Sequence, residues 1–157
     1  MKKTDLKLAP KASSRTNDPE RTMAEILAVA TKEFADKGLA GARIDEIAAA
    51  TRTSKRMIYY YFGGKEGLYV AVLEAAYGRM RHIEADLHLK DLLPEVALRN
   101  LIEFTYDHHQ GNEDFIRLVM TENVQRGAYL GQSKAIQKVN SSALEAIDDL
   151  YTRGVKQ

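Results

Sequence analysis

The stretch from Ile44 to Leu68 constrains the fold more than any other part of the chain. It reads IDEIAAATRTSKRMIYYYFGGKEGL, which predicts a short helix, a tight turn, a second short helix and a Gly63-Gly64 hinge into a longer helix. Ser54 is a good N-cap, because its hydroxyl can accept hydrogen bonds from the free N–H groups of a first helical turn. The second short helix is therefore predicted to run from residue 55 to residue 62, as part of a helix-turn-helix.

The predicted 55–62 helix has two different faces, because successive residues are about 100° apart. One arc is cationic and aromatic and contains Lys55, Arg56, Tyr59 and Tyr60. The opposite arc is mostly apolar and contains Met57, Ile58, Tyr61 and Phe62. The apolar arc must be buried, and the cations then lie at a helix N-terminus, where free N–H groups and the dipole favour an anion. Tyrosine rings can bond a phosphate or pack on a thymine methyl group, so this helix is predicted to read the DNA major groove.

Several pairs of residues in this stretch also follow a known pattern: Ile47-Ala48, Ser54-Lys55, Ile58-Tyr59, Tyr61-Phe62 and Lys65-Glu66, with Leu68. This pattern resembles the helix-turn-helix signature of TetR-family (tetracycline-repressor-like) transcriptional regulators. The resemblance spans Met23 to about Tyr77, with a weaker similarity around Glu122-Asn123. It implies a dimer that binds a pseudo-palindromic double-stranded DNA operator, usually as a repressor, and that an unidentified small-molecule effector releases.

The face analysis and the resemblance together give the residues that we expect at the DNA: Arg43, Thr53, Ser54, Lys55, Arg56, Tyr59, Tyr60, Tyr61 and Lys65. Tyr61 is the most ambiguous, since its position on the helix is close to the apolar arc. For Lys65, the resemblance implies a phosphate contact at the start of the next helix.

The chain departs from the family pattern at three places. The family usually has Thr or Ser at positions 42 and 43, where they cap the first motif helix, so the cap is missing here and Arg43 is expected to contact phosphate instead. Arg52 replaces a common glycine in the turn, which costs about 1 kcal/mol if that residue is left-handed. Arg56 stands where relatives often have Gly or Pro, and predicts an additional base or phosphate contact.

The whole chain is predicted to be all-α, because it lacks strand-like alternation of any length. We expect a disordered basic tail over residues 1–17, a helix-turn-helix DNA-binding domain over 18–64 and a helical effector-binding and dimerisation domain over 65–157. The tail, with a net charge of +4, is interpreted as a loose terminus in preference to an arm for the minor groove. Asp18-Pro19-Glu20 is a strong helix start, and Gly38 is the expected stop.

Four helices are predicted beyond the hinge. They run from Lys65 to about Leu87, from Pro94 to about His109, from Asp114 or its neighbours to near Gly127, and from a Ser133 cap to a stop at Gly154. The expected buried stripe of the first is Leu68, Val72, Ala76, Met80 and Ile83. That of the last is Ile136, Val139, Ala143, Ile147 and Leu150.

The C-terminal half is expected to provide a homodimer interface. The last-helix stripe, Leu144 and Tyr151 offer more apolar surface than one internal contact needs. Family members usually continue for several tens of residues past this point, with a helix that completes a four-helix dimer bundle. A short natural product, a fragment of a longer protein and a different dimer interface all remain open.

An effector pocket in this half is expected to be largely apolar with a few polar anchors. The candidate residues are Arg79, Phe104, Asn123, Arg126 and Tyr129.

Charge and composition narrow the function classes. Residues 1–65 hold 13 Lys and Arg against 8 Asp and Glu, whereas residues 66–157 hold 10 against 14, so the N-terminal part is the expected nucleic-acid side. The chain has no cysteine and no apolar run that could span a bilayer, which predicts a cytoplasmic protein without membrane contact. Histidines 82, 88, 108 and 109 lack the spacing of a metal site.

Motifs of nucleophilic catalysis and of phosphate or dinucleotide loops are missing, so neither an enzyme nor a cofactor is expected. The alternative reading is a helical ligand- or protein-binding module that has lost DNA binding. The missing cap at Ala42, Arg52 in the turn and the early C-terminus favour that alternative, whereas Lys55, Arg56 and Lys65 favour the regulator.

Overall fold

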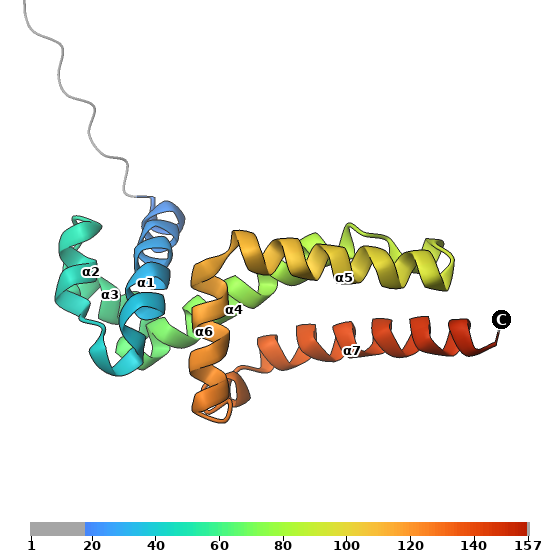
Figure 1. The fold of residues 1–157 in the computed structure, drawn as a ribbon. Coiled ribbons are helices and arrows are strands. Elements are labelled where there is room, and N and C mark those ends of the chain that lie inside the picture. The colour runs from blue at the N-terminus through green and yellow to red at the C-terminus, as the bar shows by residue number, and fades with distance from the viewer. Residues whose placement is uncertain (1–17, 157) are drawn as a thin grey trace, which may run out of the picture.

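The computed structural model describes residues 18–156, which form seven α-helices, two short 3-10 helices and no strand (Figure 1). This confirms the all-α prediction for that part of the chain. The predictions for residues 1–17 lie outside the described residues. The helices are α1 (Pro19–Gly41), α2 (Ile44–Ala50), α3 (Lys55–Phe62), α4 (Lys65–Ala85), η1 (Leu89–Asp91), α5 (Pro94–Gly111), α6 (Glu113–Val124), η2 (Leu130–Gln132) and α7 (Lys134–Val155).

Helix α1 begins where the sequence predicts. The Asp18 carboxylate caps it by accepting a hydrogen bond from the Arg21 backbone N–H at 3.2 Å, and Pro19 occupies the first helical position. Gly38 has φ 65° and breaks the helical path as expected, but the chain then makes one further turn to Gly41. The predicted stop is therefore a kink that directs the chain into α2.

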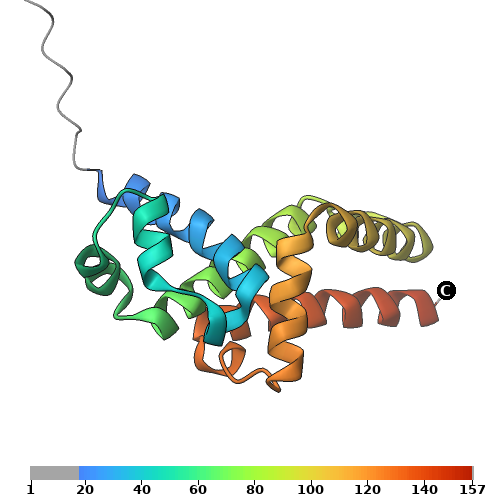
Figure 2. The same ribbon diagram turned by 60° about the vertical axis from the view of Figure 1, so that its left-hand side comes forward.

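Helices α2 and α3 lie at the end of the molecule remote from the C-terminal end of α7 (Figures 1 and 2). Gly63 and Gly64, with φ 75° and 146°, form the sharp turn from α3 into α4, as the hinge prediction requires. Helix α4 then runs from this end toward α5. Its 21 residues correspond to about 31 Å at 1.5 Å per residue, which confirms the predicted long helix.

The predicted buried stripe of α4 was only partly correct. Leu68, Val72 and Met80 are buried, but Ile83 is 40% exposed and Glu84 is buried in its place. Tyr69, Leu73 and Tyr77 are buried as well, because α1 and α7 both pack against α4. A single stripe describes a helix with one covered side, whereas α4 is covered on more than one side over its first four turns.

Helix α7 also differs from its predicted stripe. Ser133 caps it as expected, with the Oγ accepting from the Ile136 N–H at 3.1 Å, but Gly154 does not stop the helix, which ends at Val155. Ala143 and Leu150 are buried, whereas Ile147 is 47% exposed. The buried apolar residues of α7, Ile136, Ala143 and Leu150, are seven positions apart. The buried face is therefore narrower than the predicted stripe, which also included Ile147.

The remaining helices begin and end close to the predicted positions. Helix α5 begins at Pro94 and continues to Gly111, two residues beyond the predicted end. Helix α6 ends at Val124, before the expected Gly127, because Arg126 and Gly127 both have positive φ and form a turn.

One hydrophobic core joins the N-terminal helices to the C-terminal ones. It contains Ile26 and Phe34 of α1, Ile58 of α3, Leu118 of α6 and Ile136 of α7. Figure 2 shows α6 crossing beside the end of α1, and the Asp36 carboxylate of α1 pairs with the Arg117 guanidinium of α6 at 3.6 Å. Because α6 packs against α1, a displacement of α6 is expected to move α1. Helix α1 in turn packs against α2 of the helix-turn-helix.

Candidate nucleic-acid interface

The turn between α2 and α3 is tight and hydrogen-bonded. Thr53 donates its N–H to the Ala48 carbonyl at 3.0 Å, and Arg52 donates its N–H to the Ala49 carbonyl at 3.2 Å. Arg52 adopts φ 52°, the left-handed conformation that glycine adopts without steric cost. The side chain of Arg52 is exposed, so the motif tolerates it at a cost of about 1 kcal/mol.

Helix α3 separates its faces as the sequence predicts. Ser54 caps it, with Oγ accepting from the Met57 N–H at 3.3 Å. Ile58 is fully buried, whereas Tyr59 is 52% and Tyr60 78% exposed. Lys55 and Arg56 are exposed too, so the cationic and aromatic arc faces solvent in the free protein.

Tyr61 is half-buried, which matches its ambiguous position in the sequence. Its ring meets the Tyr60 ring edge to face at 5.4 Å and the Phe62 ring at 6.3 Å. Thr53, in the turn before α3, is half-buried, and Ser54 is exposed.

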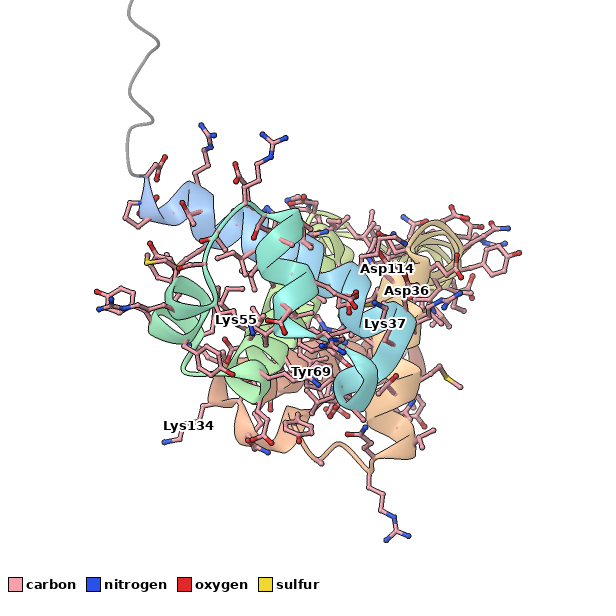
Figure 3. The ribbon with its side chains drawn as sticks, turned by 90° about the vertical axis from the view of Figure 1, so that its left-hand side faces the viewer. Asp36, Lys37, Lys55, Tyr69, Asp114 and Lys134 are labelled. Carbon is pink, nitrogen blue, oxygen red and sulfur yellow. The ribbon has the colours of Figure 1, made fainter. Side chains whose placement is uncertain are left out.

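Arg43 and Lys55 converge on one carboxylate. Lys55, the first residue of α3, pairs with Asp45, and Arg43 approaches the other oxygen of Asp45 at 3.8 Å. Figure 3 views the molecule from this end and shows Lys55 between α2 and α3. Arg43 is the N-cap residue of α2 and makes no side-chain cap hydrogen bond, as the missing Thr or Ser predicts, while its own N–H donates to Glu33 at 3.1 Å.

Lys65 has an internal partner. Its ammonium donates to the Ala40 carbonyl at 3.2 Å and thereby ties the start of α4 to the end of α1. A phosphate contact by Lys65 would compete with this bond. A second tie, from Lys37 to Glu33 and Glu46, joins α1 to α2, and the hydrogen bond to Glu46 raises the pKa of Lys37. The two links hold α4 and α2, the helices on either side of α3 in the chain, against α1.

The five effector-site candidates do not share one cavity. Arg79 lines a cavity of about 250 Å³ at the junction of α1, α4 and the α5–α6 turn. Phe104 packs on the His108 ring at 5.7 Å, next to Phe115, which lines that cavity. Asn123 and Arg126 are exposed, and Tyr129 packs edge to face on Tyr69 in the core at 5.3 Å.

A larger cavity of about 440 Å³ lies between the end of α4, η1 and α7. Leu89, Val139 and several alanines give it apolar walls, and the paired side chains of Arg81 and Glu84 line it as well. None of the five effector-site candidates predicted from the sequence lines this cavity. The sequence did contain one signal for this cavity. Arg81 and Glu84 are three residues apart, a spacing at which the two side chains can form an ion pair on one face of a helix.

His108 offers a test of the packing around the smaller cavity. Burial lowers the pKa of His108, and the neighbouring His109 and Arg79 lower it further. The unfolded chain therefore takes up a proton at this residue before the folded protein does, so stability should fall as the pH drops below about 6.5. We expect the His108→Gln variant to show a shallower loss between pH 7.5 and 5.5 in urea unfolding. Equal pH slopes for the two proteins would contradict this assignment.

The chain matches two family models. The model described as "Bacterial regulatory proteins, tetR family" matches residues 26–72, which include α2, α3 and the hinge. The description "Tetracyclin repressor-like, C-terminal domain" covers residues 94–157. The protein belongs to the TetR family. It is thus a helix-turn-helix transcriptional regulator that binds DNA.

Individual TetR-family proteins support this assignment over most of the chain. The HTH-type transcriptional repressor NicS of Pseudomonas putida is 34% identical over 144 residues, which are 92% of this chain and 68% of NicS. An HTH-type transcriptional repressor of Streptomyces coelicolor is 34% identical over 139 residues, covering 88% of this chain and 69% of that protein. The crystal structure of the hemolysin II transcriptional regulator HlyIIR has a TM-score of 0.72 at 30% identity, covering 89% and 76% of the two chains.

Other site types find no support in the described helices. None of the helices in residues 18–156 combines the length and the hydropathy that a bilayer crossing requires. Over the same residues, no three His, Cys, Asp or Glu side chains are grouped so that they could hold a metal ion.

Proposed function

We propose that this TetR-family protein is a cytoplasmic repressor that binds a pseudo-palindromic operator as a homodimer and that a small-molecule effector releases. The observation that carries the proposal is the exposed arc of α3, which holds two cations at the helix N-terminus and two tyrosines one turn further along. Two of the three TetR-family proteins described above, those of Pseudomonas putida and Streptomyces coelicolor, are named repressors. In the dimer, two copies of α3 would enter successive major grooves, with half-site centres about 34–36 Å apart.

We also propose that DNA binding and effector binding belong to different parts of the chain. Residues 18–64 bind DNA and residues 65–157 bind the effector and the second copy. At the DNA, Arg56, Tyr59 and Tyr60 reach base edges. The backbone contacts come from Arg43, Thr53, Ser54, Lys55 and Tyr61, and from Lys65 at the start of α4. Arg56, Tyr59 and Tyr60 are exposed on one arc of α3, which leaves all three side chains free to enter the groove.

The dimer seam that we propose lies on α7. Leu144, Ile147, Tyr151 and Val155 recur at helical spacing and are 68%, 47%, 68% and 68% exposed. Exposed apolar residues on one helix face mark an interaction surface, and a second copy of α7 would cover them in a self-complementary contact.

The effector site that we propose is the 440 Å³ cavity, because its volume falls in the range of small-molecule sites and its walls are mostly apolar. The five candidates from the sequence contribute no wall residue to it. An effector there would contact α4, which leads to the hinge after α3, and α7. It would release DNA only to the extent that it binds better to a form with a different separation of the two recognition helices.

Arg56→Ala tests the DNA-reading role of α3. We expect operator affinity to fall by roughly 1–3 kcal/mol if Arg56 reads a guanine, with relaxed preference at one base position. The operator is first selected from a random duplex library with the unchanged protein, and binding is then measured by fluorescence anisotropy against salt.

The matched control is Arg99→Ala, an exposed arginine on α5 that should leave binding unchanged. Affinity that does not fall with rising salt would argue against phosphate contacts. Equal binding by Arg56→Ala and the unchanged protein would mean that another residue reads the operator. If the unchanged protein selects no operator at all, the alternative module without DNA binding is favoured.

A further inference from the structure

Asp45 places a negative charge inside the surface that meets DNA. It is the second residue of α2, and its two carboxylate oxygens engage Lys55 of α3 and the Arg43 guanidinium, the latter at 3.8 Å. All three side chains are partly exposed, at 45% for Asp45, 59% for Lys55 and 67% for Arg43. The carboxylate thus occupies the two cations that are expected to bind the DNA backbone.

A phosphate group and the Asp45 carboxylate compete for the same donors. Both are anions that accept charge-assisted hydrogen bonds from ammonium and guanidinium groups. If Asp45 stays in place, it repels an approaching phosphate. If it is displaced, the DNA must offer Lys55 and Arg43 at least as good a contact. Either way, the carboxylate weakens phosphate contacts at this point of the surface.

The loss of binding affinity that the Asp45 carboxylate causes differs between random DNA and the operator. On random DNA, contacts are mostly electrostatic, salt-screened and without a fixed register. On the operator, base contacts from α3 fix the helix in the groove and hold one phosphate against the cations, so that displacement of Asp45 is offset by direct hydrogen bonds. A carboxylate in this position therefore lowers random binding more than operator binding.

We propose that Asp45 is a specificity-determining residue, which holds Lys55 and Arg43 in the absence of the operator and so suppresses binding to non-operator DNA. This inference rests on the proposed function, because it assigns a role within the same DNA-binding surface. It does not depend on the effector or on which bases α3 reads.

The Asp45→Asn variant tests the proposal with two duplexes of equal length, one random and one carrying the selected operator. Affinity for the random duplex should rise about fivefold, the scale set by loss of an exposed ion pair. The slope of the logarithm of this affinity against the logarithm of the salt concentration should become steeper by about 0.9, the value for one more neutralised phosphate. Affinity for the operator should change less than about twofold.

Two control variants separate this role from other effects. Asp107→Asn removes one exposed acid on α5, far along the chain from α2, and should leave both affinities unchanged. Asp45→Glu keeps the charge and should keep weak random binding. Thermal unfolding of each variant checks that the helix-turn-helix remains folded.

Three results would overturn the proposal although the unchanged protein binds its operator. They are lower operator affinity of Asp45→Asn with unchanged random binding, an equal rise on both duplexes, and no change on either. The first would mean that Asp45 only orients Lys55, and the second that only net charge matters. If the unchanged protein binds neither duplex, the proposed function itself fails and this inference fails with it.

Discussion

Replacing Ile58 by alanine is expected to lower the free energy of unfolding by about 2–5 kcal/mol and to abolish operator binding at physiological temperature. Ile58 is fully buried in the middle of α3 and belongs to the core that joins α1, α4 and α6. Its removal takes away apolar contacts and leaves a cavity beneath an eight-residue helix in which Ile58 is the one fully buried side chain. Urea unfolding followed by circular dichroism measures the loss.

Tyr60→Ala is the matched comparison on the same helix. Because Tyr60 is 78% exposed, its free energy of unfolding should stay within about 0.5 kcal/mol of the unchanged protein. Its operator affinity should still fall, by about 1 kcal/mol or more if the ring contacts the major groove. Comparable destabilisation by both variants would contradict the face assignment of α3.

Glu122→Ala is expected to cost about 3 kcal/mol or more. Glu122 is fully buried in α6, and one carboxylate oxygen accepts hydrogen bonds from the backbone N–H groups of Tyr129 and Leu130, each at 3.1 Å. Truncation leaves both donors without their acceptor. The same segment leads to Ser133, which caps α7 and donates to Glu74 of α4 at 2.6 Å, so its loosening should also release α7 from α4.

Glu122→Gln isolates the role of charge. The amide keeps an oxygen that can accept from the two N–H groups, so the loss should be smaller, about 1–2 kcal/mol. Glu103→Ala changes an exposed glutamate of α5 and should stay within about 0.5 kcal/mol. Urea unfolding of the three variants measures how much free energy of unfolding each one loses. A loss for Glu122→Ala no larger than for Glu103→Ala would show that the buried carboxylate does not hold the segment.

Local signals predicted the helix-turn-helix well because each boundary has a local cause. Asp18 and Ser54 cap their helices through their own side chains, and Gly63-Gly64 needs backbone angles that glycine adopts freely. The buried face of a helix depends instead on how many neighbours cover it. Ile83 and Ile147 were therefore misassigned, since their exposure is set by where α1, α5 and α7 lie relative to α4.

The candidate sites show the same division. Exposure of Lys55, Arg56, Tyr59 and Tyr60 followed from helical periodicity alone. The pairing of Asp45 with Lys55 and the role of Glu122 required knowledge of which helices meet, because each carboxylate reaches groups outside its own helix. The five effector candidates were chosen by residue type, and residue type alone does not determine which side chains share a cavity.

The most direct test of the regulator assignment is a selection of duplex DNA from a random library by the purified chain, followed by light scattering of the complex. We predict an enriched pseudo-palindrome that binds two copies, with half-site centres about 34–36 Å apart. Its affinity should fall steeply and linearly as the logarithm of the salt concentration rises. A library in which no sequence is enriched, or a selected site that binds one copy only, would contradict it.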